Sequence, residues 1–158
     1  MDDHERLVAI EQIKALKARY FRYLDTRDWA GMRMIFTTDA VFDARASGGD
    51  DGGATGAEVI RDSNQWLYEG REVIAKFIET AVGDTVTAHH GHGHEIEIHS
   101  SEQASGVIAM EDRIWSAKGD AKAILLHGYG HYVEEYRKED AAWRIARSKL
   151  TRLNVILN

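Results

Sequence analysis

The spacing of apolar residues predicts two helices at the start of the chain. Over residues 3–24, apolar positions recur every three or four residues, which gathers them on one stripe of an α-helix. The stripe comprises Leu7, Ile10, Ile13, Leu16, Tyr20 and Leu24. Asp2 or Asp3 is available as the N-cap of this helix. A second, shorter helix is expected after Asp28, and its inward residues are Trp29, Met32, Ile35 and Phe36.

The next part of the chain alternates between loop and helix signals. Thr38-Asp39 is expected to end the second helix, and residues 40–42 resemble a short strand. Residues 47–56 read S-G-G-D-D-G-G-A-T-G, which predicts a loop without core residues. Residues 57–82 are helical in character, and Gly70 divides them into two pieces.

After Gly83 the pattern changes to the alternation that is typical of strands. Four strands are expected, at about 85–99, 104–117, 122–136 and 142–156, with hairpin turns at 118–120 and 138–140. Helices followed by an antiparallel meander indicate an α+β fold in which the helices cover one face of a curved sheet. No repeat divides the sequence, so residues 1–158 are expected to form a single domain.

Alternation also assigns the faces of these strands. In 122–136, the apolar face carries Ile124, Leu126, Tyr132 and Tyr136 together with Gly128 and Gly130. In 104–117, the corresponding set is Ile108, Met110, Asp112 and Ile114. Asp112 is an acid on an otherwise apolar face. It is either a second polar group of a pocket or the partner of a nearby arginine, and the second reading is favoured.

Composition excludes several functional classes. A net charge of −6 argues against nucleic-acid binding, which requires a clustered basic face. The absence of cysteine excludes disulfides, thiolate metal sites and a cysteine nucleophile. No apolar run approaches the roughly 20 residues that span a bilayer, and the polar N-terminus is unlike a secretory signal. We therefore expect a cytoplasmic protein without membrane contact.

The strongest concentration of chemistry is a histidine cluster, T-A-H-H-G-H-G-H-E-I-E-I at 87–98. On an ideal strand, His90, His92 and His94 lie on one side, so a metal site has to be considered. Additional ligands are available from Glu95, His99 and His131. The alternative, which we favour, is that these three histidines lie on a solvated or subunit-facing surface and that no metal is bound.

The alternation of this strand raises a difficulty for His89. Ile96 and Ile98 have the opposite parity to His89, so in a regular strand His89 points to solvent when the isoleucines face the core. Gly91 and Gly93 are suitable positions for a β-bulge. We therefore predict a bulge or sharp bend between residues 90 and 95 if His89 faces inward.

Several phrases together resemble the SnoaL-like group of the nuclear-transport-factor-two-like superfamily, in the branch of scytalone dehydratase and hexachlorocyclohexane dehydrochlorinase. They are I-E-Q-I-K-A-L-K-A-R-Y (10–20), Y-L-D (23–25), F-T-T-D-A-V-F-D (36–43), G-R-E-V-I-A-K-F (70–77), T-A-H-H-G (87–91), G-H-Y-V-E-E-Y (130–136) and W-R-I-A-R (143–147). They span nearly the whole chain in the family's order. The resemblance implies a cone of helices against a strongly curved sheet that encloses a pocket.

The resemblance also implies a catalytic pair, Asp25 and His89. Taken singly, each residue favours a structural role, which for Asp25 is a polar end to the first helix. A carboxylate that binds one imidazole nitrogen fixes the tautomer and makes the other nitrogen a better base. The resemblance implies Tyr20 and Phe42 as substrate-binding residues, and the alternation of the strands adds Met110, Asp112 and Tyr132 as pocket walls. Trp66 and Tyr68 are expected to form a lid or to pack against another subunit.

Two functions follow from this interpretation. The first is a cofactor-free lyase or isomerase, similar to a dehydratase or dehydrohalogenase, that removes a proton from a small apolar or aromatic molecule. The alternative is a non-catalytic small-molecule-binding or assembly module, such as a protein like the small subunit of a ring-hydroxylating oxygenase, because this fold serves both purposes. In either case we expect a homodimer or homotrimer.

Overall fold

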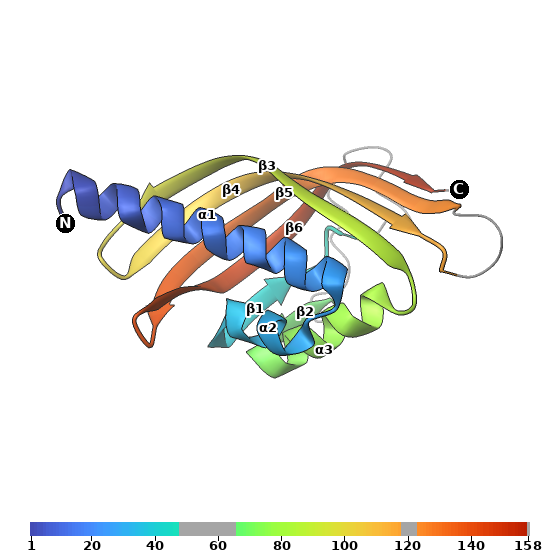
Figure 1. Ribbon diagram of the computed structural model, residues 1–158, viewed down its shortest axis with the longest axis horizontal. Coiled ribbons are helices and arrows are strands. Elements are labelled where there is room, and N and C mark those ends of the chain that lie inside the picture. The colour runs from blue at the N-terminus through green and yellow to red at the C-terminus, as the bar shows by residue number, and fades with distance from the viewer. Residues whose placement is uncertain (48–65, 118–122, 158) are drawn as a thin grey trace.

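The computed structural model describes residues 1–47, 66–117 and 123–157, which form three helices and six strands. The helices are α1 (Asp3–Thr26), α2 (Trp29–Ile35) and α3 (Arg71–Val82). The strands are β1 (Phe36–Asp43), β2 (Leu67–Glu69), β3 (Val86–Ile98), β4 (Gln103–Trp115), β5 (Ile124–Glu139) and β6 (Ala142–Leu157). All three helices lie against one face of a curved sheet (Figure 1), which confirms the predicted α+β class. No helix among these residues is long and apolar enough to cross a bilayer.

The sheet is open, with strand order β2-β1-β6-β5-β4-β3. Strand β1 pairs in parallel with β6, and all the other neighbours are antiparallel. Strands β5 and β6 form the predicted hairpin, but its two turn residues are Asp140 and Ala141, so only Asp140 belongs to the predicted turn at 138–140. Both turn residues have positive φ, 52° and 61°, as a two-residue hairpin of the type I′ kind requires.

Helix α1 begins and ends with standard caps. Asp2 and Glu5 form a reciprocal capping box, and Arg27 adopts the left-handed conformation that ends the helix. The predicted buried stripe is confirmed except for Leu7, which is 63 % exposed. The observed stripe passes instead through Ala9, about 200° around the helix from Leu7 at 3.6 residues per turn.

The region between α1 and α3 differs from its prediction in two places. Strand β1 begins directly at Phe36, so Thr38-Asp39 lies within a strand and does not interrupt the chain. Residues 67–69 form strand β2, not helix, because they pair with β1 as Phe42 opposite Tyr68. Helix α3 follows Gly70 as expected. The predicted loop after Ser47, the helical piece up to residue 65 and the turn at 118–120 lie outside the described residues.

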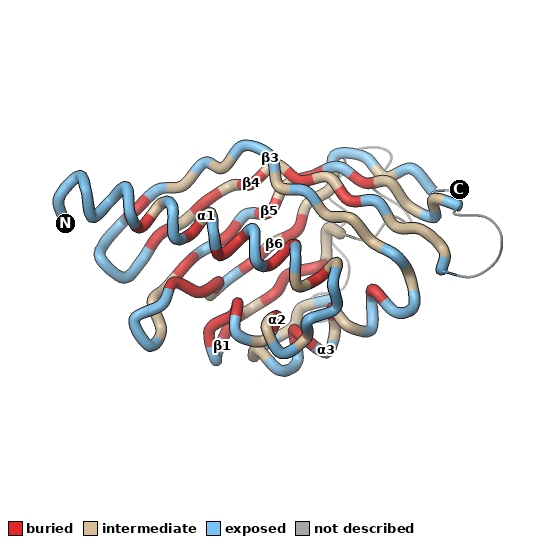
Figure 2. Tube along the Cα trace, in the orientation of Figure 1, coloured by how far each residue is buried: buried red, intermediate tan, exposed pale blue. Residues whose placement is uncertain are grey.

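The inward face of the sheet follows the predicted alternation. Buried positions alternate along β4 and β5 on the side that faces the helices (Figure 2). They are Ala104, Gly106, Ile108, Met110 and Asp112 on β4, and Gly128, Gly130, Tyr132, Glu134 and Tyr136 on β5. This face packs against the buried stripe of α1 and forms the core with it. Three charged side chains are buried between them, Lys17 of α1, Asp112 of β4 and Glu134 of β5.

The predicted bulge in β3 is confirmed. Gly91 pairs with Met110 and His94 pairs with Ile108, so His92 and Gly93 together oppose the single residue between these partners. The bulge reverses the alternation: His89 turns inward with a side chain 7 % exposed, while His90 is exposed. His94 follows the bulge, shares the inward face with Ile96 and Ile98 and is half-buried, which corrects the prediction that it lies on a solvated or subunit-facing surface.

Candidate functional site

Asp25 and His89 form a hydrogen-bonded pair between the end of α1 and the start of β3. The Nδ1 atom of His89 lies 2.7 Å from Asp25 Oδ1, and the backbone N–H of His89 donates to Asp25 Oδ2 at 2.9 Å. The hydroxyl of Thr87 donates to Asp25 Oδ1 at 2.8 Å. Asp25 lies in the last turn of α1, which Arg27 ends in the left-handed conformation. The three hydrogen bonds hold the Asp25 carboxylate beside β3.

This geometry determines the tautomer of the imidazole. An ionised carboxylate only accepts hydrogen bonds, so His89 Nδ1 carries the proton and donates it to Asp25. The other nitrogen, Nε2, then has a lone pair that is free to accept a proton. The arrangement can therefore act as an oriented general base.

A second carboxylate lies on the opposite side of the imidazole. Asp112 Oδ2 is 3.9 Å from His89 Nε2. Arg152 Nη1 and Nη2 donate to the two Asp112 oxygens at 2.6 and 2.7 Å, and the Asp112 and Arg152 side chains are 3 % and 8 % exposed. Asp112 is thus both the partner of an arginine and a neighbour of the pair. Arg152 was missed, although it has the inward parity of Leu150.

Two tyrosines lie on the inner side of this ion pair. The hydroxyls of Tyr20 and Tyr132 are 3.5 Å apart, and both side chains are buried. Burial raises the pKa of Tyr20 and of Tyr132 above the ordinary phenol value, so both hydroxyls remain neutral donors near pH 7. The Nζ atom of Lys17 lies over both rings, 3.5 Å from the centroid of Tyr132 and 4.0 Å from that of Tyr20.

Deeper in the core, Lys17 belongs to a fully buried ion pair that the sequence reasoning also missed. Lys17 Nζ donates to Glu134 Oε1 at 2.6 Å, and both side chains are 0 % exposed. Ser148 donates to the same oxygen at 2.8 Å and Tyr136 to Oε2 at 2.7 Å. Burial lowers the pKa of Lys17, and Glu134 opposes this shift. Strand alternation could have identified Glu134, because it lies midway between Tyr132 and Tyr136, which both face inward.

The structure separates the other predicted pocket residues into two places. Met110 is beside the ion pair, with its sulfur 3.6 Å from Arg152 Nη1. Phe42 packs instead on Phe77 of α3, at a ring distance of 5.9 Å. Tyr68 stacks on the same ring at 3.8 Å, and Trp66 contacts it edge-on at 6.5 Å. Their predicted role as a lid or subunit contact stays a prediction.

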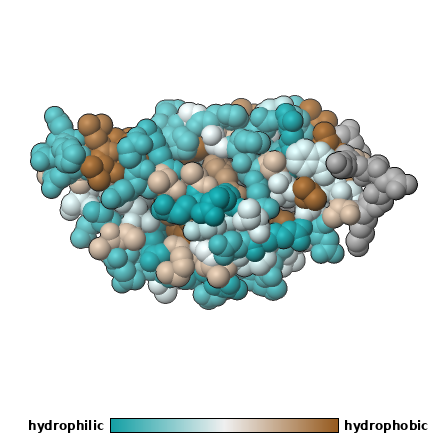
Figure 3. All heavy atoms as spheres, in the orientation of Figure 1, coloured by the Kyte–Doolittle hydropathy of each residue, from teal (hydrophilic) through white to brown (hydrophobic). Residues whose placement is uncertain are grey.

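His92 of the cluster lies on the outer face of the sheet, away from the inward-facing His89. On the outer face of the sheet, Glu111 contacts His127 at 2.8 Å and His92 at 3.5 Å. Within the described parts of the chain, no three histidine, aspartate or glutamate side chains are placed to hold a metal ion. The space-filling view shows a mixed hydrophilic and hydrophobic surface on the helix side (Figure 3).

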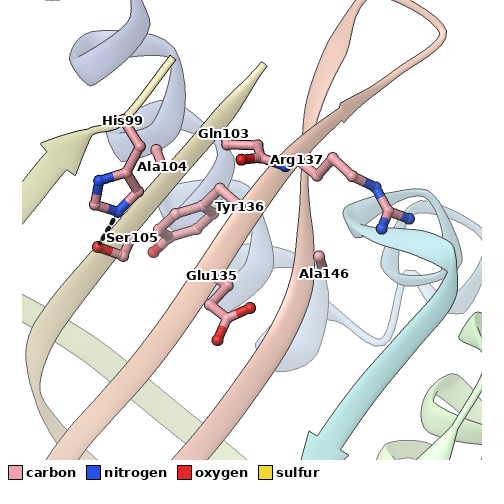
Figure 4. Close-up of a pocket in the computed structure, with 8 residues that line it drawn as sticks. All are labelled: His99, Gln103, Ala104, Ser105, Glu135, Tyr136, Arg137 and Ala146. Atoms are coloured by element: carbon pink, nitrogen blue, oxygen red, sulfur yellow. Dashed lines mark hydrogen bonds between the residues drawn. The ribbon is translucent and has the colours of Figure 1, made fainter. Parts of the chain in front are cut away.

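A groove of about 320 Å³ lies elsewhere on the sheet (Figure 4). Its lining consists of His99, Gln103, Ala104, Ser105, Glu135, Tyr136, Arg137 and Ala146. His99 Nε2 is 2.8 Å from the Ser105 hydroxyl there. This groove contains neither Asp25 nor His89, so it is separate from the candidate site.

Comparison with known proteins supports one family. A family model described as a SnoaL-like domain matches residues 5–149. A protein of unknown function from Mycobacterium tuberculosis is 26 % identical, with a TM-score of 0.70 over 94 % of this chain and 74 % of that one. A putative scytalone dehydratase from Novosphingobium aromaticivorans is 17 % identical, with a TM-score of 0.79 over 99 % and 92 %. A hexachlorocyclohexane dehydrochlorinase (LinA type 2) is 16 % identical, with a TM-score of 0.76 over 99 % and 93 %.

Proposed function

The chain belongs to the SnoaL-like family, and we propose that it is a lyase or isomerase in which His89 removes a proton from a small, mostly apolar molecule. The observation that carries the proposal is the pairing of His89 Nδ1 with Asp25 at 2.7 Å, which leaves Nε2 free to accept a proton on the buried side of the sheet. Proteins of the same fold that are described as a dehydratase and a dehydrochlorinase support this class of reaction.

The proposed step is an elimination. His89 Nε2 takes a proton from a substrate carbon, and the electron pair of that C–H bond forms a double bond to the adjacent carbon. The leaving group on the adjacent carbon departs with its own bonding pair, either as halide or as hydroxide that takes up the proton from His89 Nε2 and is released as water. Asp25 offsets the positive charge that forms on the imidazole. An isomerase would return the same proton to a different carbon.

The neutral hydroxyls of Tyr20 and Tyr132 are suited to a substrate oxygen. A buried phenol that remains protonated donates a hydrogen bond to a carbonyl, and this donation increases as negative charge develops on the oxygen. The two hydroxyl oxygens are 3.5 Å apart, so one acceptor atom at about 2.7 Å from each can accept a hydrogen bond from both. We therefore expect compounds with a carbonyl or hydroxyl next to the reacting carbon to be better substrates than pure hydrocarbons.

The test is turnover of a defined panel by wild-type protein and two variants. The panel contains small β-hydroxyketones and chlorinated cyclohexanes, and alkene formation is followed by NMR. His89→Ala is expected to reduce the rate by about 10²–10⁴-fold, because the general base is lost. His90→Ala is the matched control, since His90 is adjacent but exposed on the opposite face, and it should retain full activity.

Two results would contradict the proposal. Full activity in His89→Ala with an unchanged circular dichroism spectrum would show that another group is the base. Saturable binding of panel compounds without any product from wild-type protein would favour the alternative, a non-catalytic carrier.

A further inference from the structure

The imidazole of His89 lies between two carboxylates that come from different elements. Asp25 of α1 binds Nδ1 at 2.7 Å, and Asp112 of β4 faces Nε2 at 3.9 Å. The second distance is longer than a hydrogen bond. A lone pair on Nε2 and a carboxylate oxygen are both acceptors, so a gap of this size is expected while the imidazole is neutral. Once Nε2 gains a proton, it becomes a hydrogen-bond donor, and the Asp112 carboxylate that faces it can accept.

Two carboxylates beside one imidazole create a problem for a general base. Each negative charge within about 4–6 Å favours the protonated ring, and a ring that is already protonated cannot accept a proton. Arg152 resolves this problem because its guanidinium binds both Asp112 oxygens and compensates their charge. Tyr20 and Tyr132 next to this region are uncharged phenols, and behind them Lys17 and Glu134 compensate each other as an ion pair.

The backbone opposite this ion pair leaves room for it. Gly128 of β5 pairs with Asp112 of β4 and lies beside Arg152. A Cβ atom at position 128 would overlap both Arg152 Nη1 and Asp112 Oδ1. The position therefore accepts glycine alone if the ion pair is to remain where it faces His89.

We propose that the Asp112–Arg152 ion pair sets the protonation of His89: Arg152 keeps the resting imidazole neutral, and Asp112 stabilises the imidazolium that forms when Nε2 takes a proton. Asp112 and Arg152 then act through His89 and are positioning residues for it. The catalytic consequence rests on the proposed function, whereas the effect on His89 protonation does not.

The experiment is an NMR titration of the histidine side chains in substrate-free protein, with the His89 signal assigned by its loss in His89→Ala. In Asp112→Asn, the titration midpoint of His89 is expected to move to lower pH by about one unit, because a negative neighbour is lost. In Arg152→Gln, it is expected to move to higher pH by a similar amount, because Asp112 is no longer compensated. The double variant Asp112→Asn/Arg152→Gln should return close to wild type.

Matched controls come from the next residues on the same strand. Glu111 and Arg113 flank Asp112 but point to the outer face, where they pair with each other at 3.0 Å. Glu111→Gln and Arg113→Gln make the same changes in net charge on the other side of the sheet. Neither should move the His89 midpoint by more than a few tenths of a pH unit.

The opposite signs of the two shifts separate an electrostatic role from a structural one. Loss of local structure would move the midpoint in the same direction in both variants, and that result would overturn the proposal, as would an unchanged midpoint. If Arg152→Gln does not fold, the histidine titration of Asp112→Asn is the test by itself. This variant should keep the fold, because asparagine can still accept a hydrogen bond from Arg152. A midpoint that stays or rises in this variant overturns the proposal.

Turnover gives an independent reading once a substrate is known. The acid limb of the rate profile should move to higher pH in Arg152→Gln and to lower pH in Asp112→Asn. Failure of the proposed function would leave no turnover to measure but would not alter the NMR titration, so the two failures are distinguishable.

Discussion

Two buried ion pairs among the described residues, Lys17–Glu134 and Asp112–Arg152, differ in how completely their polar atoms are hydrogen-bonded. In Lys17–Glu134, both side chains are 0 % exposed, and the two carboxylate oxygens accept from Lys17, Ser148 and Tyr136 within 2.8 Å. In Asp112–Arg152, the carboxylate faces an imidazole nitrogen at 3.9 Å. Among the contacts of the described residues, Arg152 Nε has no hydrogen-bond partner.

The difference distinguishes a structural cluster from a reactive one. The hydrogen bonds of the Lys17–Glu134 network join its own members, so its charges serve packing and orientation. We call this pair the closed pair and Asp112–Arg152 the open pair. In the open pair, Asp112 lies next to the oriented base His89 and can accept a hydrogen bond from Nε2 when the imidazole gains a proton. Tyr20 and Tyr132 lie between the two, since Lys17 packs over both rings and their hydroxyls meet near the open pair.

The largest expected effect tests the closed pair. Glu134→Gln removes the charge that compensates Lys17 and keeps one of the two acceptor oxygens that Ser148 and Tyr136 use, so it is expected to cost about 3–5 kcal/mol of unfolding free energy. Lys17→Met/Glu134→Gln removes both charges and should recover more than half of that loss. Urea denaturation followed by circular dichroism measures both. A double variant as unstable as the single one would show that the network, not the unpaired charge, determines stability.

An intermediate effect is expected at the open pair. Gly128→Ala introduces a Cβ atom into the space of the Asp112–Arg152 ion pair, and overpacking of this kind costs about 1–3 kcal/mol. Gly93→Ala is the control, because a Cβ atom there meets nothing within 4 Å and its effect should be within about 0.5 kcal/mol. Equal thermal stability of the two variants would mean that the ion pair moves aside freely.

The smallest effect concerns His94, which follows the bulge and lies on the inward face with Ile96 and Ile98. Burial, followed by the nearby Lys14 and Lys17, lowers the pKa of His94 from 6.5. The unfolded chain therefore binds more protons than the folded one below pH 6.5, so this contribution to stability is present above pH 6.5 and is lost as the pH falls through the folded-state pKa. His94→Gln should flatten the decline of stability between pH 7 and 5. The exposed His90→Gln should leave it unchanged, and equal slopes would contradict the assignment.

Parity within single strands could be read from the sequence. If His89 faces inward, its parity conflict with the isoleucines at 96 and 98 requires a bulge at the glycines, and the structure has it between Gly91 and His94. The inward position of Asp112 followed from the same rule. The pairing of Asp25 with His89, however, came from resemblance to a family, because alternation cannot connect a helix end to a strand 64 residues later.

The sequence by itself determined the α+β class, the stripe of α1 apart from Leu7, and the faces of β4 and β5. These features depend on local periodicity, which the order of residues contains. Only the tertiary structure decided that Lys17 meets Glu134 and that Arg152 compensates Asp112 beside His89. The physical reason is that a buried charge is tolerated only beside its partner, and partners 40 and 117 positions apart are brought together by the fold alone.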